Sequence, residues 1–232
     1  MAEEIFKRVE KKYLLNQIQK KLLMKLINKY IEPDKYNKYT ICNIYFDTDN
    51  FDLIKTSIEK PLYKEKLRLR SYGIPKLNDK VFLEIKKKYK DVVSKRRVII
   101  NLQEVYRYLQ KGIIPKCNKQ IMNEINYMFD YYQVTPKMFV AYDRFAYHGI
   151  EDKNFRITFD YNIRSRDNDL YLEHGDYGEK LLKEDEFIME VKILGGLPIW
   201  FTKILSDLKI YPISFSKYGN VYKNKMKEGM MV

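Results

Sequence analysis

Alternation of polar and apolar residues is the strongest pattern along this chain. In seven segments the charged or polar side chains occupy one face and the apolar side chains the other, which is typical of strands with one face on a core. The seven segments are residues 6–12, 63–72, 80–90, 93–100, 138–146, 155–161 and 187–194. Residues 40–46 are apolar enough for a buried strand and end at the turn-forming residues 47–50. We therefore expect a mainly antiparallel sheet.

Between the strands, apolar residues spaced three and four apart predict helices. The predicted helices cover residues 16–32, 102–111, 119–132 and 198–209, with a short helix after residue 50. The polar region 167–186 is expected to be a loop, and residues 226–232 a disordered tail.

The charged strand faces and the spread of the helices together predict the fold class. If helices cover the apolar faces of the sheet, the charged faces are left to line its inside, and a lining of Lys and Arg cannot be a dry core. We therefore predict an α+β fold, an antiparallel β-barrel that forms a tunnel with helices packed outside. No linker rich in Gly, Pro or Ser divides the chain, so a single domain over residues 1–225 is expected.

Residues 63–73 contain the clearest basic row of the chain. The row consists of Lys64, Lys66, Arg68 and Arg70, and the apolar Leu67 and Leu69 between them face the other side of the strand. Four like charges therefore lie about 7 Å apart on one strand face. Such charges repel one another, and the row is favourable once an anion meets it. Alone, this pattern also fits a solvated strand face. Two further strands repeat it, with the cations Lys86, Lys88, Lys95 and Arg97.

The composition agrees with an anionic ligand but does not choose one. The chain has 232 residues and a formal net charge of +13, which attracts nucleic acid, anionic lipid and polyphosphate alike. Cys42 and Cys117 lie far apart and form no CxxC motif, so neither a disulfide framework nor a zinc site is indicated. No signal sequence and no apolar run of about 18 residues is present, so we expect a cytoplasmic protein without a membrane span of its own.

A few carboxylates lie on the charged strand faces. A carboxylate inside a cationic phosphate site could hold a hard divalent ion through oxygen, and charge balance for nearby Lys is the alternative. These acids are Glu10, Glu84, Asp160 and Glu190. Tyr142 and Ser216 could donate hydrogen bonds to phosphate oxygens. The histidines pair with no nucleophile, and neither a P-loop nor a GxGxxG motif is present.

Taken in order, the motifs on these strands are similar to those of one family. The chain resembles the VTC polyphosphate polymerase domain of the triphosphate tunnel metalloenzyme (CYTH-like) superfamily from about residue 5 to residue 222. The motifs are Arg8-Val9-Glu10-Lys11-Lys12-Tyr13, Leu67-Arg68-Leu69-Arg70-Ser71-Tyr72-Gly73, Phe82-Leu83-Glu84-Ile85-Lys86, Lys95-Arg96-Arg97, Tyr142-Asp143-Arg144, Arg156-Ile157-Thr158-Phe159-Asp160, Glu190-Val191-Lys192 and Phe215-Ser216-Lys217-Tyr218.

The resemblance implies an enzyme that transfers the γ-phosphate of ATP to a growing polyphosphate chain. The residues implied as catalytic are Lys12, Arg68, Arg70, Lys86, Arg144 and Lys217. Those implied to bind phosphate or nucleotide are Arg8, Lys66, Lys88, Lys95, Arg97, Tyr142, Arg156, Lys192 and Ser216. Glu190 and Glu10 would hold Mn²⁺ or Mg²⁺. Because a terminal phosphate oxygen would attack, catalysis would rest on positioning and charge neutralisation.

Two positions depart from the relatives. Hydrolytic members of the superfamily begin with ExExK, and the first glutamate is replaced here by Arg8. Loss of a metal-binding carboxylate favours the polymerase over a tripolyphosphatase or a nucleoside or thiamine triphosphatase. Lys88 stands where eukaryotic domains carry histidine.

Two other readings stay open beside the polymerase, namely a hydrolase of the same fold and a non-catalytic polyphosphate-binding module. A membrane or protein partner of unknown identity also stays open. Sequence-specific binding of nucleic acid is disfavoured, because the cations are spread over many strands and form no recognition helix.

Overall fold

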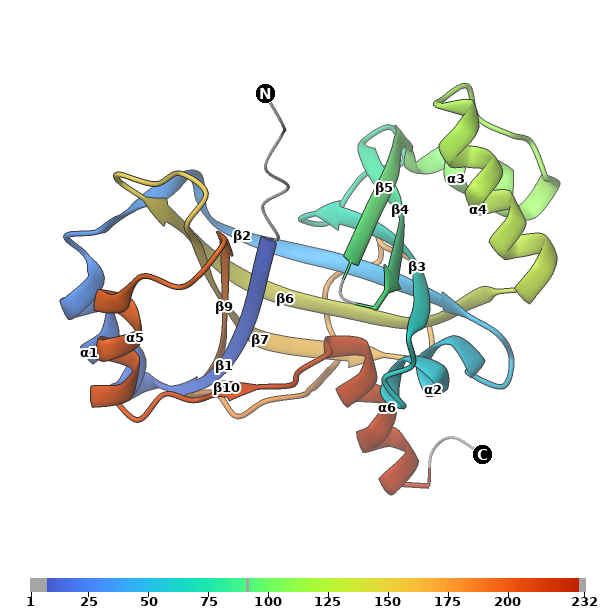
Figure 1. Cartoon of the computed structure of the whole chain (residues 1–232). Helices are drawn as coiled ribbons and strands as arrows, with labels where there is room; N and C mark the ends of the chain where they lie inside the picture. Colours follow the sequence, from blue (N-terminus) through green and yellow to red (C-terminus); the bar gives the residue numbers. More distant parts are fainter. Residues whose placement is uncertain (1–7, 91, 230–232) are drawn as a thin grey trace. The chain divides into compact units, whose positions relative to one another are not determined.

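The computed structural model describes residues 8–90 and 92–229 of the chain (Figure 1). The strands are β1 (Arg8–Asn16), β2 (Ile31–Asp47), β3 (Tyr63–Tyr72), β4 (Lys80–Tyr89), β5 (Val92–Asn101), β6 (Thr135–Gly149), β7 (Arg156–Arg166), β8 (Glu179–Lys180), β9 (Glu186–Leu194) and β10 (Pro212–Ile213). The helices are α1 (Gln17–Ile27), α2 (Asp52–Ile58), α3 (Leu102–Lys111), α4 (Lys119–Tyr132), α5 (Ile199–Asp207) and α6 (Lys217–Lys227). In the described part, no helix is both long enough and apolar enough to cross a membrane.

The strands form one sheet with antiparallel pairing. The order of neighbours is β10-β1-β9-β7-β6-β2-β3-β4-β5, and β8 pairs with β7. The predicted α+β class and the antiparallel sheet are confirmed. The hydrogen-bonded order of the described residues ends at β10 and β5, so strand pairing does not close the sheet.

The chain divides into two compact units. Unit 1 contains the described residues of Met1–Thr40, Tyr142–Ile163 and Leu182–Phe215, and unit 2 those of Ile41–Ala141, Arg164–Leu181 and Ser216–Val232. Strands β2, β6 and β7 each contribute residues to both units. The single domain predicted for residues 1–225 stays a prediction.

In unit 2, the apolar faces of β3, β4 and β5 form a core with α3 and α4 (Figure 1). Leu67 and Leu69 on β3 are buried together with Ile125 of α4. Asn101 and Glu104 form a capping box that starts α3 directly after β5, so these helices fold back over the apolar face. The charged residues that alternate with Leu67 and Leu69 are thereby left on the opposite face.

Unit 1 repeats this arrangement with β1, β7 and β9. Tyr13 and Leu15 of β1 pack with Leu23 of α1 and Phe201 of α5 in a second core. A capping box of Asn16 and Gln19 starts α1 immediately after β1. In both units, helices therefore cover the apolar strand face, as the sequence predicts.

The predicted helix 16–32 is too long. Helix α1 ends at Ile27, and β2 already begins at Ile31. Tyr30 stacks on Trp200 with 3.9 Å between ring centroids, and its carbonyl accepts a hydrogen bond of 3.0 Å from the Ile150 amide. These tertiary contacts outweigh a local pattern that suits a further helical turn.

The segment after residue 214 is more regular than predicted. Ser216 caps α6, and its hydroxyl accepts a hydrogen bond of 3.2 Å from the Gly219 amide. The helix continues to Lys227, so the predicted tail is helical at residues 226 and 227, and residues 230–232 lie outside the described part.

Candidate functional site

The charged face of β3, β4 and β5 gathers most of the predicted phosphate ligands of unit 2. Antiparallel pairing places Lys66, Lys86 and Lys95 directly opposite one another in one row across three strands. Arg68, Glu84 and Arg97 form the next row. We call this surface the cation face. Its members are Lys64, Lys66, Arg68, Arg70, Glu84, Lys86, Lys88, Lys95 and Arg97.

Glu84 is the carboxylate of the cation face, and its side chain is only 1 % exposed. Arg68 donates to it through Nε at 2.8 Å, and Lys95 Nζ lies 2.7 Å from its other oxygen. Arg70 and Arg97 follow at 3.8 and 3.9 Å. Burial alone would raise the pKa of Glu84, but the cations outweigh it and lower this pKa to about 2. The sequence pattern places Glu84 on a charged strand face but does not assign it to the site. In the structure, Glu84 is the carboxylate around which the arginines and Lys95 of the cation face gather.

Lys66 has a different environment from these cations. Among the described residues its ammonium forms no ion pair with a carboxylate, and it donates a hydrogen bond of 3.1 Å to the hydroxyl of Ser216. Burial, together with repulsion from Lys64, Lys86 and Arg68, lowers the pKa of Lys66 to about 7. A positive charge at Lys66 is therefore unfavourable until an anion arrives.

The start of α6 places Ser216 beside the cation face, where it accepts the hydrogen bond from Lys66, and Lys217 is the first residue of this helix. Tyr218 fixes this turn, because its hydroxyl donates a hydrogen bond of 2.9 Å to the buried carboxylate of Asp47. The same carboxylate accepts hydrogen bonds from the amides of Leu53 and Ile54 at the start of α2. Asp47 thus ties β2, α2 and α6 together, a role that the sequence did not suggest.

Unit 1 brings together the predicted metal ligands and two predicted cations. Lys12 faces Glu190 across β1 and β9, and Glu10 faces Lys192. Lys12 Nζ pairs with Glu10 and lies 3.8 Å from Glu190, while Lys192 pairs with Glu190 and lies 4.0 Å from Glu10. We call these four residues the acid–base cluster.

Arg144 is influenced by Glu190 of the acid–base cluster, and its guanidinium is held by Asp160. Two hydrogen bonds of 2.6 and 2.8 Å join the guanidinium to the Asp160 carboxylate, and the guanidinium lies over the Tyr142 ring at 5.3 Å from its centroid. Burial disfavours the charged guanidinium, but Asp160, Tyr142 and Glu190 outweigh it and raise the pKa of Arg144. Arg144 therefore stays charged, which suits a role in binding anions.

Arg156 and Arg8 are the remaining predicted site residues of unit 1. Arg156 pairs with Asp34, an acid that the sequence did not connect to the site. Arg8 opens β1, and its side chain lies outside the described part of the chain.

The donor set of the acid–base cluster fits a metal that arrives with its substrate. Across residues 8–90 and 92–229, no group of three or more His, Cys, Asp and Glu side chains is placed to hold a metal ion. Mg²⁺ and similar hard ions, however, are commonly held by one or two carboxylates plus substrate phosphates. Glu190 and Glu10 supply two such carboxylates, each already balanced by a lysine.

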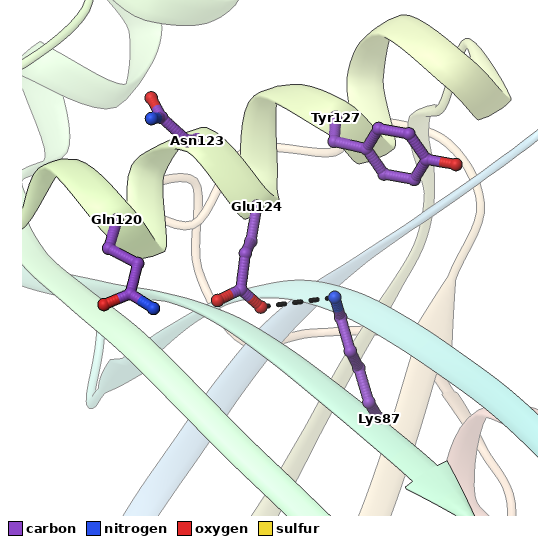
Figure 2. A pocket seen from close by; sticks show the side chains of 5 residues that line it. All are labelled: Lys87, Gln120, Asn123, Glu124 and Tyr127. Carbon is purple, nitrogen blue, oxygen red and sulfur yellow. Dashed lines mark ion pairs between the residues drawn. The ribbon is translucent and has the colours of Figure 1, made fainter.

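The opposite face of β4 has a separate polar pocket. Figure 2 shows Lys87 reaching Glu124 of α4, with 3.2 Å between the charged atoms. Gln120, Asn123 and Tyr127 complete the lining. Because Lys87 alternates with Lys86 and Lys88, it lies behind the cation face, and the pocket contains no predicted site residue.

Two solved structures are similar to this chain in their fold. The chain is similar to the crystal structure of a candidate adenylate cyclase from Bacillus halodurans, with 17 % identity over 93 % of this chain and 96 % of that chain, and a TM-score of 0.54. It is also similar to a candidate adenylyl cyclase from Hippeastrum, described as having a dominant triphosphatase activity, with 15 % identity, 97 % coverage of both chains and a TM-score of 0.50.

At these identities the two likenesses concern the fold alone, and they confirm the predicted tunnel fold. No curated protein matches the chain. The VTC domain matches residues 7–225, which is nearly the whole length, and this chain therefore belongs to the VTC domain family.

Proposed function

We propose that this protein is an ATP-dependent polyphosphate polymerase that transfers the γ-phosphate of ATP to the end of a polyphosphate chain. The observation that carries the proposal is the cation face, where eight Lys and Arg side chains share one surface with the single carboxylate Glu84. An excess of cations of this size is suited to a multiply charged phosphate chain. Membership of the VTC domain family supports the same substrate class.

In this proposal, the cation face binds the phosphates. Arg68 and Arg70 are held in place by Glu84 and Asn43, so their remaining donors are preorganised for phosphate oxygens. Lys66, Lys86, Lys88, Lys95, Arg97, Ser216 and Lys217 provide further donors. Lys12, Arg144, Arg156, Lys192 and Tyr142 of unit 1 contribute to binding of nucleotide and product, and Arg8 is proposed for the same role on sequence grounds.

Glu190 and Glu10 would hold Mn²⁺ or Mg²⁺, which supplies neutralisation of the charge that develops on the transferred phosphoryl group. Lys12 and Lys192 form ion pairs with these carboxylates and orient them. The terminal phosphate oxygen of the acceptor chain attacks the γ-phosphorus, the bond to the bridging oxygen breaks, and ADP leaves. The protein positions the two anions against their mutual repulsion, which would otherwise keep them apart.

Incubation of the purified protein with ATP and Mn²⁺, followed by gel separation and polyphosphate staining, tests the proposal. We expect a ladder of products longer than the substrate. Glu190→Gln should remove the ladder and retain binding of polyphosphate, whereas Glu124→Gln, in the pocket behind the cation face, should leave the ladder unchanged. Absence of turnover with retained polyphosphate binding would instead identify a binding module.

A triphosphate hydrolase of the same fold is the second candidate. It is favoured by the triphosphatase activity described for the similar Hippeastrum protein. Release of free phosphate from ATP or tripolyphosphate without chain growth would identify this activity. Replacement by Arg8 of the first glutamate of the hydrolase motif favours the polymerase.

A further inference from the structure

Lys66 differs in its hydrogen bonding from the cations that surround Glu84. Arg68, Lys95 and Arg97 approach Glu84, whereas the Lys66 ammonium has a hydroxyl oxygen as its hydrogen-bond partner. Cationic groups of β3 and β4 lie around it. Lys64 and Arg68 flank it on β3, Lys86 lies opposite on β4, and the carboxylate of Asp47 on β2 acts against these positive charges.

This environment favours the neutral amine. Burial and the neighbouring cations lower the pKa of Lys66 to about 7, so the neutral amine with its free lone pair on Nζ is accessible near neutral pH. An ordinary lysine of pKa about 10.4 is neutral in only about one molecule in a thousand or fewer at that pH. Desolvation of this kind is how lysines become nucleophiles toward carbonyl compounds.

The neighbours of Lys66 are donors suited to a phosphate group. Lys86 lies directly opposite and Lys95 lies beyond it in the same row. Side chains at directly opposite positions have Cβ atoms about 5 Å apart, so an anion held by this row lies within reach of Nζ. A reactive amine and a phosphate-binding row therefore coincide.

From this coincidence we infer that Lys66 is a modification site for phosphorylated aldehydes, which the row Lys66, Lys86 and Lys95 captures by their phosphate and Lys66 binds covalently as an imine. The inference rests on the phosphate binding of the proposed function and extends it to a second class of ligand. Nζ attacks the carbonyl carbon, a C–N bond forms, and the resulting carbinolamine loses the former carbonyl oxygen as water. The imine nitrogen then takes one proton and carries the positive charge.

Such a modification would control the site. The bound aldehyde would occupy the row with its own phosphate and would replace a primary amine by an imine, so triphosphates and polyphosphates would be excluded. Removal by hydrolysis reverses the reaction. The protein would thus be inhibited by phosphorylated aldehydes in competition with its phosphate substrates.

Pyridoxal 5′-phosphate is a suitable probe. The protein is incubated with it, the imine is reduced with sodium borohydride, and the labelled peptide is identified by mass spectrometry. We expect label at Lys66 that is suppressed by tripolyphosphate and reaches its plateau near pH 8. Pyridoxal, which lacks the phosphate, should label Lys66 at least about tenfold less. Labelling that keeps rising to about pH 10 would indicate an ordinary lysine and would overturn the inference.

Two conservative variants separate the site from the background. Lys66→Arg should remove the label, because arginine keeps the charge without a reactive amine. Lys87→Arg, on the same hairpin but behind the cation face, should label like the parent protein. Equal loss of label in both variants, or label spread evenly over the lysines, would contradict the inference.

The polymerase assay keeps the two proposals apart. A polyphosphate ladder from a protein whose Lys66 is not labelled would overturn the modification site alone. Protected labelling of Lys66 in a protein that makes no ladder would overturn the polymerase alone.

Discussion

Glu84 illustrates how a single residue organises several others. Its carboxylate is buried between Arg68 and Lys95, and both partners approach it to within 2.8 Å. Removing one partner of a buried ion pair leaves the other charges uncompensated, which commonly lowers the free energy of unfolding by about 3–5 kcal/mol. Glu84 therefore contributes to folding as well as to the orientation of the phosphate ligands.

Glu84→Gln should lower the free energy of unfolding by about 3 kcal/mol, measured by urea denaturation at pH 7. The matched control is Glu124→Gln, which breaks the more exposed ion pairs with Lys87 and Arg96 and should cost about 1 kcal/mol or less. Equal costs in the two variants would mean that the cation face does not depend on its central carboxylate.

The pH dependence of stability follows from the same group. The pKa of Glu84 is lowered from 4.5 to about 2 by the native cations, so below pH 4.5 the unfolded state binds more protons than the native state. The contribution of Glu84 is fully present above pH 4.5 and is lost as the pH falls toward 2. In Glu84→Gln the loss of stability between pH 4.5 and pH 2 should be smaller than in the parent protein.

At the scale of elements, strand register decides which charges meet. Lys66, Lys86 and Lys95 come from three strands, and pairing of β3 with β4 and of β4 with β5 aligns them in one row. A shift of one residue would turn a whole strand face toward the core. The buried leucines of β3 prevent such a shift, so the apolar face fixes the geometry of the charged face.

A buried hydrogen bond contributes to the position of helix α6. Tyr218→Phe removes the donor to buried Asp47 and should lower the free energy of unfolding by about 1–2 kcal/mol. It should also raise the KM for ATP, because Ser216 and Lys217 lie in the same turn. Tyr222→Phe, one turn later on the same helix, should change both quantities little. If the two variants behave alike, α6 is not positioned through Asp47.

At the scale of the whole molecule, charge dominates the behaviour expected in solution. The formal net charge of +13 and the cations gathered on β3, β4 and β5 favour binding of polyanions over other ligands. Without an anion these charges repel one another and reduce stability. A bound phosphate chain should therefore stabilise the native state.

Tripolyphosphate at about 100 times its Kd should stabilise the protein by roughly 2.7 kcal/mol, which corresponds to a rise in Tm of about 5–10 °C. Thermal denaturation with and without the ligand measures this shift. Lys86→Gln, on the cation face, should reduce the shift, and Lys87→Gln, on the opposite face of β4, should retain it. A shift that sulfate reproduces at equal ionic strength would argue against a phosphate-chain site.

Local patterns predicted most of the elements because each has a strong signal of its own. Helices α3 and α4 appear with their predicted bounds, since their apolar stripes and caps agree. The missed elements are those that depend on distant partners. Strand β10 has two residues that pair with β1, and β2 extends back to Ile31 where the sequence predicted helix.

The candidate site also has features that the sequence pattern predicts and features that depend on distant partners. Alternation on β3 and β4 is enough to predict that Lys66, Arg68 and Lys86 share a face, because a strand's side chains point alternately to its two sides. It cannot predict that Arg68 meets Glu84 or that Arg156 meets Asp34. Those pairs join separate strands, and their partners are set by register and packing.

The sequence by itself determined which chemical groups this protein presents and on which strand faces, since periodicity and charge are properties of the chain. The tertiary structure decided how those groups balance one another. The cations around Glu84 lower its pKa although the carboxylate is buried, and burial lowers the pKa of Lys66, which has no carboxylate partner in the described residues. The reason is physical, because a pKa depends on desolvation and on neighbouring charges, and both are fixed only when distant strands pack together.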